Sequence, residues 1–124
     1  MQSVQSTLNR FLTAFSQLQL DDMLACFADD ATAFFPAEHQ RLRLTGKAAI
    51  GAAFAQVLAR VRGTGAMQLR LDAEGVQIQA FGDVAVITFH ILGDHLSRRT
   101  FVVRRTDDQW LIVHFHGSNV PSHA

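Results

Sequence analysis

Two histidines near the end of the chain have a spacing that suits shared binding. His114 and His116 are separated by one residue, so on a β-strand both imidazoles lie on one face about 7 Å apart. A metal ion could bridge such a pair. However, no carboxylate of the same parity accompanies it, and His90 belongs to a different segment. The pattern therefore favours histidines that hydrogen-bond across a subunit interface, and no metal site is predicted.

Three further residues could take part in acid–base or nucleophilic chemistry. Glu38 and His39 are adjacent in a predicted loop, where an acid–base pair could act, although solvated loop charges are the simpler interpretation. Cys26 has no neighbouring base in the sequence, so we expect it to pack as a small apolar residue. Because no spacing typical of a catalytic triad occurs, no catalytic residue is assigned.

The phenylalanines form the strongest pattern in the chain. There are ten Phe, one Trp and no Tyr, so the aromatic side chains supply bulk and few hydrogen bonds. Those on predicted inward-facing stripes either fill a core or line an apolar cavity suited to a flat ligand, which Thr100 or Arg98 would orient. No cofactor is predicted. The predicted ligand-binding residues are Phe11, Phe15, Phe35, Phe54, Phe89, Arg98, Thr100, Val102, Val113 and Phe115.

The first half of the chain has the hydrophobic period of helices. Apolar residues recur every three or four positions, which is typical of helices with one buried stripe. Asp29 and Asp30 are expected to end the second helix, and Pro36 to end a short strand. The expected elements are a helix over residues 4–18, a short helix from Asp21 to Phe27, a strand from Ala31 to Phe35, and a helix from Thr45 to Gly63.

From Ala66 onward the period falls to two, which indicates a sheet. Alternation begins with Met67 to Leu71 and continues through Val76 and Ile78. Turn residues then divide the remainder into strands over residues 84–92, 98–105 and 110–118. Helices followed by a meander of long strands predict one α+β domain over residues 1–124, with the helices on one face of a bent, mostly antiparallel sheet.

The last strand is predicted to have two different faces. Its odd positions, Leu111, Val113, Phe115 and Gly117, are expected to meet the helices. Its even positions, Trp110, Ile112, His114, His116 and Ser118, mix apolar and polar side chains as a subunit interface does. We therefore expect a homodimer through the sheet, and the alternative is an outer face covered by a terminal segment.

The pairing of the last two strands follows from their hairpin. A two-residue turn at Asp107-Asp108 places Thr100 beside Phe115, Val102 beside Val113, and Arg98 beside Gly117. This turn lacks the glycine that its type prefers, so a three-residue loop that exchanges the faces of one strand stays open as an alternative.

Composition limits the classes of partner. Eleven basic side chains balance eleven acidic ones, so no excess charge favours a nucleic acid or an anionic membrane as partner. The single cysteine excludes a disulfide framework and a thiolate zinc cluster. The chain shows no signal peptide and no apolar run long enough to cross a membrane. A cytoplasmic protein is the expectation.

Several segments resemble known families. Asn9–Leu12, Cys26–Thr32 and Leu44–Ile50 resemble the N-terminal half of SnoaL-like proteins and ketosteroid isomerases, which belong to the nuclear transport factor 2-like (cystatin-like) superfamily. Thr32–Glu38 and Arg104–Ser118 are similar to the association domain of calcium/calmodulin-dependent kinase II and its bacterial relatives. The resemblance implies a cone of three helices over a curved sheet, with a pocket between them, a dimer through the convex sheet face and larger rings of dimers.

The departures from these families concern the site. The resemblance to ketosteroid isomerase places Phe35 at the catalytic base, Phe11 at the tyrosine and Thr100 at about the second acid, so proton transfer by that route is disfavoured. Relatives of the association domain have an acidic residue at the position of Phe35 in this chain, and pocket arginines at positions near Ile91, Thr100 and Gly117. An arginine-lined anion site is therefore not expected, although the side chain of Arg98 could place one guanidinium at the entrance of the pocket.

Three functions remain after these observations. The first is a small-molecule-binding domain of the SnoaL-like kind with an apolar pocket, whose enzymatic activity is left open. The second is an oligomerisation module resembling the kinase association domain. The third, an isomerase of the ketosteroid type, requires Asp or Tyr where this chain has Phe35 and Phe11.

Overall fold

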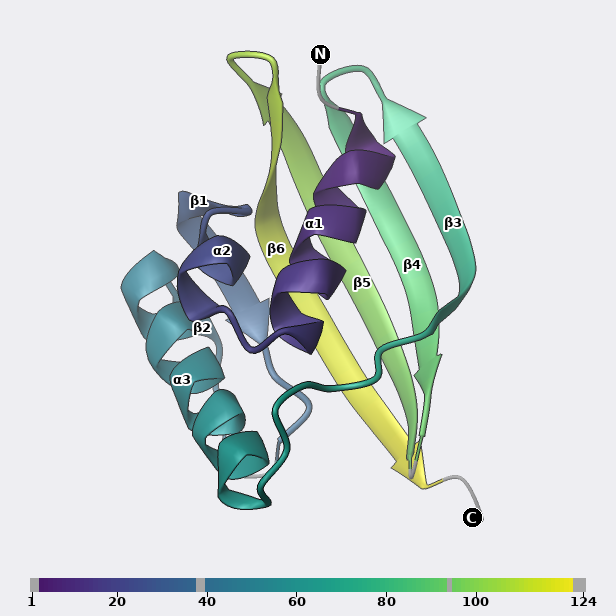
Figure 1. The fold of residues 1–124 in the computed structure, drawn as a ribbon. Helices are drawn as coiled ribbons and strands as arrows, with labels where there is room; N and C mark the ends of the chain where they lie inside the picture. Colours follow the sequence, from purple (N-terminus) through teal and green to yellow (C-terminus); the bar gives the residue numbers. More distant parts are fainter. Residues whose placement is uncertain (1–2, 38–39, 94, 122–124) are drawn as a thin grey trace.

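Three helices lie on one face of a curved six-stranded sheet (Figure 1). The computed structural model describes residues 3–37, 40–93 and 95–121. The helices are α1 (Val4–Ser16), α2 (Leu20–Leu24) and α3 (Lys47–Gly63). The strands are β1 (Phe27–Phe34), β2 (Leu44–Thr45), β3 (Ala73–Phe81), β4 (Val84–Leu92), β5 (His95–Thr106) and β6 (Gln109–Pro121). The α+β architecture predicted from the sequence is therefore confirmed.

Local chemistry accounts for the helix starts. Ser3 and Ser6 form a capping box at α1, in which each side chain accepts a hydrogen bond from the other residue's backbone N–H. Before α3, Gly46 has a φ of 94°, a conformation that side chains disfavour. Within the part of the chain that the structure describes, no helix is long and apolar enough to cross a lipid bilayer.

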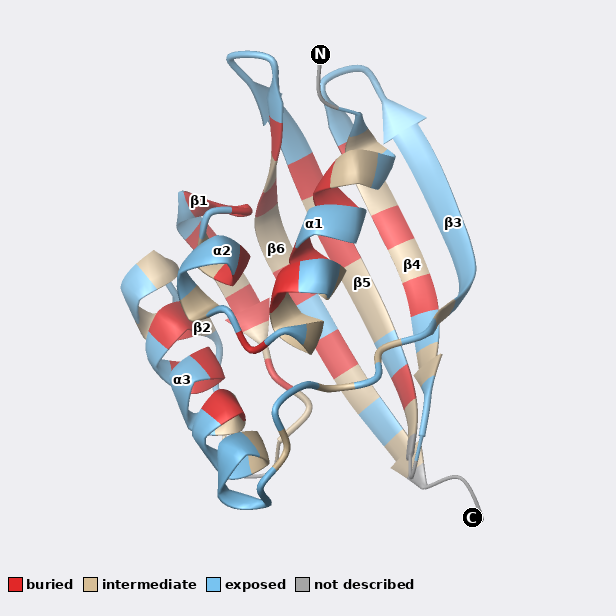
Figure 2. Ribbon diagram, viewed as in Figure 1, coloured by how far each residue is buried: buried red, intermediate tan, exposed pale blue. Residues whose placement is uncertain are grey.

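The sheet has the strand order β2-β1-β6-β5-β4-β3. β1 and β6 are parallel, and the other neighbouring strands are antiparallel. Buried residues alternate with less buried ones along β4 and β5, beneath the helices, whereas β3 is almost wholly exposed (Figure 2). The face of the sheet that carries the helices is called the inner face below, and the opposite one the outer face.

Several predicted boundaries are wrong: Thr45, predicted to begin the third helix, belongs to β2, and that helix begins at Lys47. α2 ends at Leu24, and Phe27 is the first residue of β1, so Asp29 and Asp30 lie within a strand rather than at a helix end. Both carboxylates are exposed, and they pair with Lys47 and Arg104 at 3.5 and 3.8 Å. Residues 67–71 form no strand, although their alternation predicts one. They cross from α3 to the sheet, and one backbone hydrogen bond, from Leu69 N to Ser16 O, fixes them to α1.

The hairpin between β5 and β6 has the two-residue turn. Asp107 and Asp108 have φ values of 51° and 63°, and Thr106 pairs with Gln109. Aspartate tolerates this left-handed conformation, so a glycine is not needed. From the turn to the pair Val103–Ile112 the predicted register holds.

A β-bulge at Val113 changes the register beyond that point. The next pairs are Val102 with His114 and Phe101 with Phe115, so Val113 is the additional residue of β6. The bulge reverses the parity of the strand: Trp110 and Ile112 are buried before it, and Phe115 and Gly117 after it. The prediction that Trp110 and Ile112 face outward is therefore wrong, as is the prediction that Leu111 faces the helices.

Candidate ligand pocket

An apolar cavity of about 60 Å³ lies between α1, α3 and the inner face of the sheet. It is closed by aromatic side chains from every element around it, and all six phenylalanines predicted as ligand-binding residues line it. The lining residues are Phe11, Leu12, Phe15, Phe35, Pro36, Phe54, Phe89, Ile91, Arg99, Phe101 and Phe115.

The rings pack around Phe54 and Phe101, edge to face at Phe101 and mostly tilted at Phe54. The Phe54 ring lies 4.7 Å from Phe35 and 5.8 Å from Phe11, centroid to centroid. Phe101 lies 5.2 Å from Phe11 and 5.3 Å from Phe115. Such contacts stabilise the cluster beyond the burial of its area. Their close packing leaves a space much smaller than the roughly 300–1,000 Å³ of ordinary ligand sites.

Arg99 brings a positive charge to the edge of this apolar cavity. Its guanidinium carbon lies 5.7 Å from the centroid of the Phe115 ring, over the ring face. Burial lowers the pKa of Arg99 to about 10, so the group is still protonated at neutral pH. Among the described residues, no carboxylate forms an ion pair with it, and its one hydrogen bond is from Nη1 to Arg98 O at 3.5 Å.

Gly117 makes room for this guanidinium. A Cβ atom at Gly117 would lie 2.6 Å from Arg99 Nη1 and 3.1 Å from Pro36 Cδ. Gly117 pairs directly with Arg99 on the neighbouring strand. The glycine therefore lets the arginine lie flat across β6 beside the cavity.

Four predicted ligand-binding residues lie away from the cavity. Arg98, Thr100 and Val102 belong to the alternate set of β5 residues, on the outer face, because the bulge shifts their partners to Ser118, His116 and His114. Val113 is the bulge residue itself and does not line the cavity. The register predicted from the hairpin alone was wrong at these positions.

The structure places Phe101 and Arg99 where the sequence predicted Thr100 and Arg98. Ile91, Leu12 and Pro36 also line the cavity, and none of the five was predicted to do so. A usable signal existed for Phe101, because a phenylalanine in a strand under helices favours the buried face. For Arg99 no such signal exists, since an arginine lies on each side of the strand.

The two histidines of β6 lie together on the outer face. Their ring centroids are 6.3 Å apart, and His114 Nδ1 lies 2.8 Å from Thr32 Oγ1. Phe34 contacts both imidazoles, at 5.8 and 5.2 Å. Within residues 3–37, 40–93 and 95–121 no three His, Cys, Asp or Glu side chains gather as metal ligands do.

His114 should make the protein less stable in mild acid. Burial, followed by the nearby His116 and Arg43, lowers the pKa of His114 below its ordinary value of 6.5. The unfolded chain therefore binds the proton more readily, and stability falls as the pH drops below about 6.5 towards the native pKa. Denaturant unfolding at about pH 7.5 and about pH 5.5 should show a smaller loss for His114→Gln than for the native protein. An equal loss in both proteins would contradict this linkage.

The remaining candidates for chemistry lie elsewhere. Cys26 is fully buried, burial raises the pKa of its thiol, and Sγ lies 3.6 Å from Asp22 O. It packs as a small apolar residue, as predicted, since a buried protonated thiol is a poor nucleophile. Glu38 and His39 lie outside the described residues.

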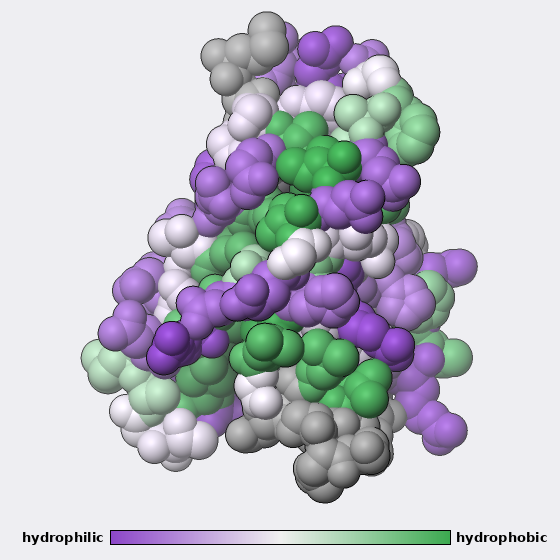
Figure 3. Space-filling model, turned by 90° about the vertical axis from the view of Figure 1, so that its right-hand side faces the viewer, coloured by the Kyte–Doolittle hydropathy of each residue, from purple (hydrophilic) through white to green (hydrophobic). Residues whose placement is uncertain are grey.

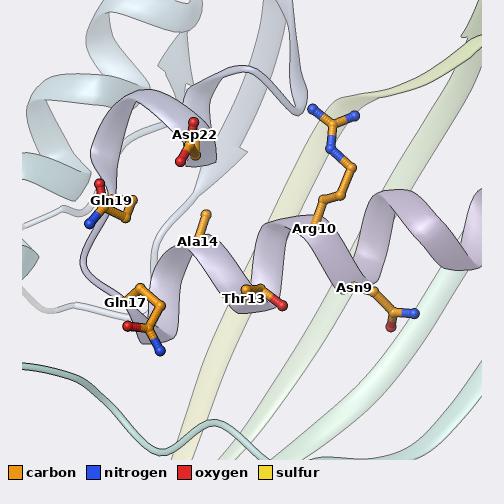
Figure 4. A pocket seen from close by; sticks show the side chains of 7 residues that line it. All are labelled: Asn9, Arg10, Thr13, Ala14, Gln17, Gln19 and Asp22. Carbon is orange, nitrogen blue, oxygen red and sulfur yellow. The ribbon is translucent and has the colours of Figure 1, made fainter.

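A larger hollow of about 410 Å³ runs over α1 and α2. Its side chains are spread over two sides of α1 rather than directed at one point: Asn9 and Thr13 lie on one side, and Arg10 and Asp22 on the other (Figure 4). Because no group of reactive side chains converges there, the aromatic cavity is the better candidate site.

Solved structures share this fold. An NTF2-like protein of unknown function from Pseudomonas putida KT2440 is 24% identical over 93% of this chain and 82% of its own, with a TM-score of 0.78. An uncharacterised protein with a cystatin-like fold from Caulobacter vibrioides is 13% identical over 98% of this chain and 89% of its own, with a TM-score of 0.80. The molecule therefore has the cystatin-like, NTF2-like fold.

The family follows from the sequence comparison. The model of the SnoaL-like domain matches residues 4–123, and the chain belongs to this family. A Thiobacillus denitrificans protein assigned as a calcium/calmodulin-dependent protein kinase type II association domain is 25% identical over 95% of each chain, with a TM-score of 0.74. Comparison with curated protein sequences finds no match.

Proposed function

We propose that the protein binds a small, largely apolar molecule with an anionic group, whose body lies among the phenylalanine rings and whose charge lies on Arg99. The observation that carries this proposal is a protonated guanidinium held against an aromatic cavity with no carboxylate partner among the described residues. A desolvated charge is costly without a counter-charge, and an anionic ligand would supply one.

The size of the cavity sets a condition on binding. A space of about 60 Å³ holds little more than water, so a ligand must displace rings at its edge. Phe35 and Pro36 directly follow the last residue of β1 and lie outside the ladder. We expect these two to move, because fewer backbone hydrogen bonds hold them.

The described residues that line the cavity include no carboxylate, histidine or cysteine. Among the described residues that line the cavity, Arg99 is the one titratable side chain. Phe11 and Phe35 line the cavity at the positions that the family resemblance assigns to the tyrosine and base of ketosteroid isomerase. We therefore propose binding and orientation of the ligand, and no proton transfer by these residues.

Benzoate and its neutral analogue benzamide would test the binding proposal by NMR titration. Arg99→Gln should weaken benzoate binding about tenfold, because a charge-assisted hydrogen bond is lost, and should leave benzamide unchanged. Gly117→Ala keeps the charge but pushes the guanidinium aside, so it should weaken benzoate as well. Arg98→Gln is the matched control, since Arg98 lies on the outer face. Equal loss in Arg98→Gln and Arg99→Gln would contradict the proposal.

A second candidate function is self-assembly through the outer face of the sheet. Five apolar residues lie there near the β3–β4 and β5–β6 hairpins, and we call them the outer apolar patch: Phe81, Val84, Val86, Val102 and Leu111. Phe81 is 65% exposed and Val84 is 37% exposed. Arg104 separates Leu111 from Val84, whereas Phe81, Val84, Val86 and Val102 are neighbours on adjacent strands, and an apolar surface of this kind is typical of protein interfaces. A homodimer, or a ring of dimers as in the kinase association domain, would cover this patch.

A further inference from the structure

A second hollow, separate from the aromatic cavity, lies on the outer face and has a volume of about 320 Å³. Strand pairing explains its lining. Thr88, Thr100 and His116 form one row across β4, β5 and β6, and His90, Arg98 and Ser118 form the next. Phe89 and Arg99 also border it, but they belong to the inner-facing set of residues.

These six side chains surround a small area of surface. Neighbouring strands are about 4.8 Å apart and same-face residues about 7 Å apart along a strand, so the two rows enclose roughly 7 by 10 Å. All six carry hydrogen-bond donors: one guanidinium, two imidazoles and three hydroxyls. Among the described residues, no carboxylate lines the hollow. Glu74, which pairs with His90 on the edge strand β3, lies beyond it.

Two contacts orient the donors. Arg98 Nε donates to Ser118 Oγ at 3.1 Å, which leaves the two terminal nitrogens of the guanidinium without a partner among the described residues. The His116 ring packs against Phe34, at 5.2 Å between centroids, while the imidazole stays exposed. The guanidinium and the imidazole are thereby held at opposite sides of the hollow, in adjacent rows.

We propose that this hollow is a binding site for a tetrahedral oxyanion of the phosphate type. A guanidinium fork matches two oxygens of such an anion. Donors from three strands surround the site, and a tetrahedral anion presents oxygens in several directions, whereas a planar carboxylate presents only two. Arg99 borders the hollow but belongs to the inner-facing set of β5 residues, and the proposed oxyanion is a different ligand from the one proposed for the aromatic cavity.

Titration with inorganic phosphate at constant ionic strength, followed by NMR, tests the site. Arg98→Gln should weaken phosphate binding about tenfold, because its fork of charge-assisted hydrogen bonds is lost. Arg104→Gln is the matched control: Arg104 is another exposed arginine on the outer face of β5, outside the hollow. It should leave the affinity within about twofold, since its only contribution is distant surface charge.

Further arms separate the possible results. Glycerol phosphate binding more tightly than inorganic phosphate would identify a phosphomonoester as the ligand class, and weaker binding would identify the free anion; both support the site. Acetate binding as tightly as phosphate would overturn the tetrahedral assignment. Equal loss in Arg98→Gln and Arg104→Gln, or no binding to the native protein at tens of millimolar phosphate, would overturn the proposal. Arg98→Gln should weaken phosphate binding but leave benzoate binding unchanged, because Arg98 lines this hollow and not the aromatic cavity, so failure here is distinguishable from failure of the aromatic site.

Discussion

Val103→Asp should unfold the protein, whereas Val102→Asp, the same change one residue earlier, should leave it folded. Val103 is fully buried on the inner face, opposite Ile112. A carboxylate there costs several kcal/mol because it is desolvated without a counter-charge. A domain of this size has a total stability of about 5–15 kcal/mol. Circular dichroism and denaturant unfolding of the two variants would measure the difference.

The same pair of variants tests self-assembly. Val102 lies between Val86 and His114 on the outer face and is only half-buried. In a single chain an aspartate at this position reaches solvent, but in the proposed dimer it would lie within the outer apolar patch. Light scattering should therefore give the mass of a dimer or ring for the native protein and of a monomer for Val102→Asp. A monomeric native protein would refute the assembly, and a folded Val103→Asp would refute the assigned burial.

The composition of β5 explains why its faces could not be predicted from the sequence. Arg98-Arg99, Val102-Val103 and Arg104-Arg105 place the same residue type on both faces of the strand. Alternation therefore carries almost no information there, and the assignment depends on pairing with β6. That pairing was predicted correctly as far as Ile112, but a bulge depends on three-dimensional strain and twist rather than on a local residue signal.

Prediction was more successful where side-chain size decides burial. The phenylalanines of α1 and α3 lie on apolar stripes, and most of the remaining positions of these two helices are small or polar, so their inner face was evident. The fold followed from the change of period between the two halves and from the family resemblance. The edge strand β3 shows the limit of this reasoning: its apolar Val76 and Ile78 are 39% and 37% exposed, because no helix reaches that side.

The surface around β3 is uncovered by helices, so its apolar side chains are exposed. Viewed from that side, hydrophobic groups lie at the surface among hydrophilic ones (Figure 3). Apolar side chains on an unpaired edge can promote association between sheets. The alternation of β3 thus reports the pleat of the strand correctly, but says nothing of whether helices cover it.

Phe54→Ala should produce the second large effect, a loss of about 3–5 kcal/mol in the free energy of unfolding. Phe54 is 2% exposed, and its ring contacts those of Phe11, Phe15, Phe27, Phe35 and Phe115. Truncation removes these contacts and joins the vacated space to the cavity of about 60 Å³. The melting temperature should fall by on the order of 10–20 °C.

The enlarged cavity of Phe54→Ala should also bind an apolar ligand, which would raise the melting temperature of the variant. Because an apolar cavity of sufficient size binds benzene, saturating benzene should raise the melting temperature of Phe54→Ala but not of the native protein. Phe81→Ala is the control, since Phe81 is largely exposed. It is made in the Val102→Asp background, because Phe81 also belongs to the outer apolar patch and Val102→Asp removes the proposed assembly. There it should change the free energy of unfolding by only about 0.5 kcal/mol. If Phe54→Ala were as stable as the control, or showed no response to benzene, the packed aromatic cluster would not be what closes the pocket. The proposal that a ligand displaces Phe35 and Pro36 would then lose its physical basis, because it assumes that the phenylalanine rings fill the space the ligand needs.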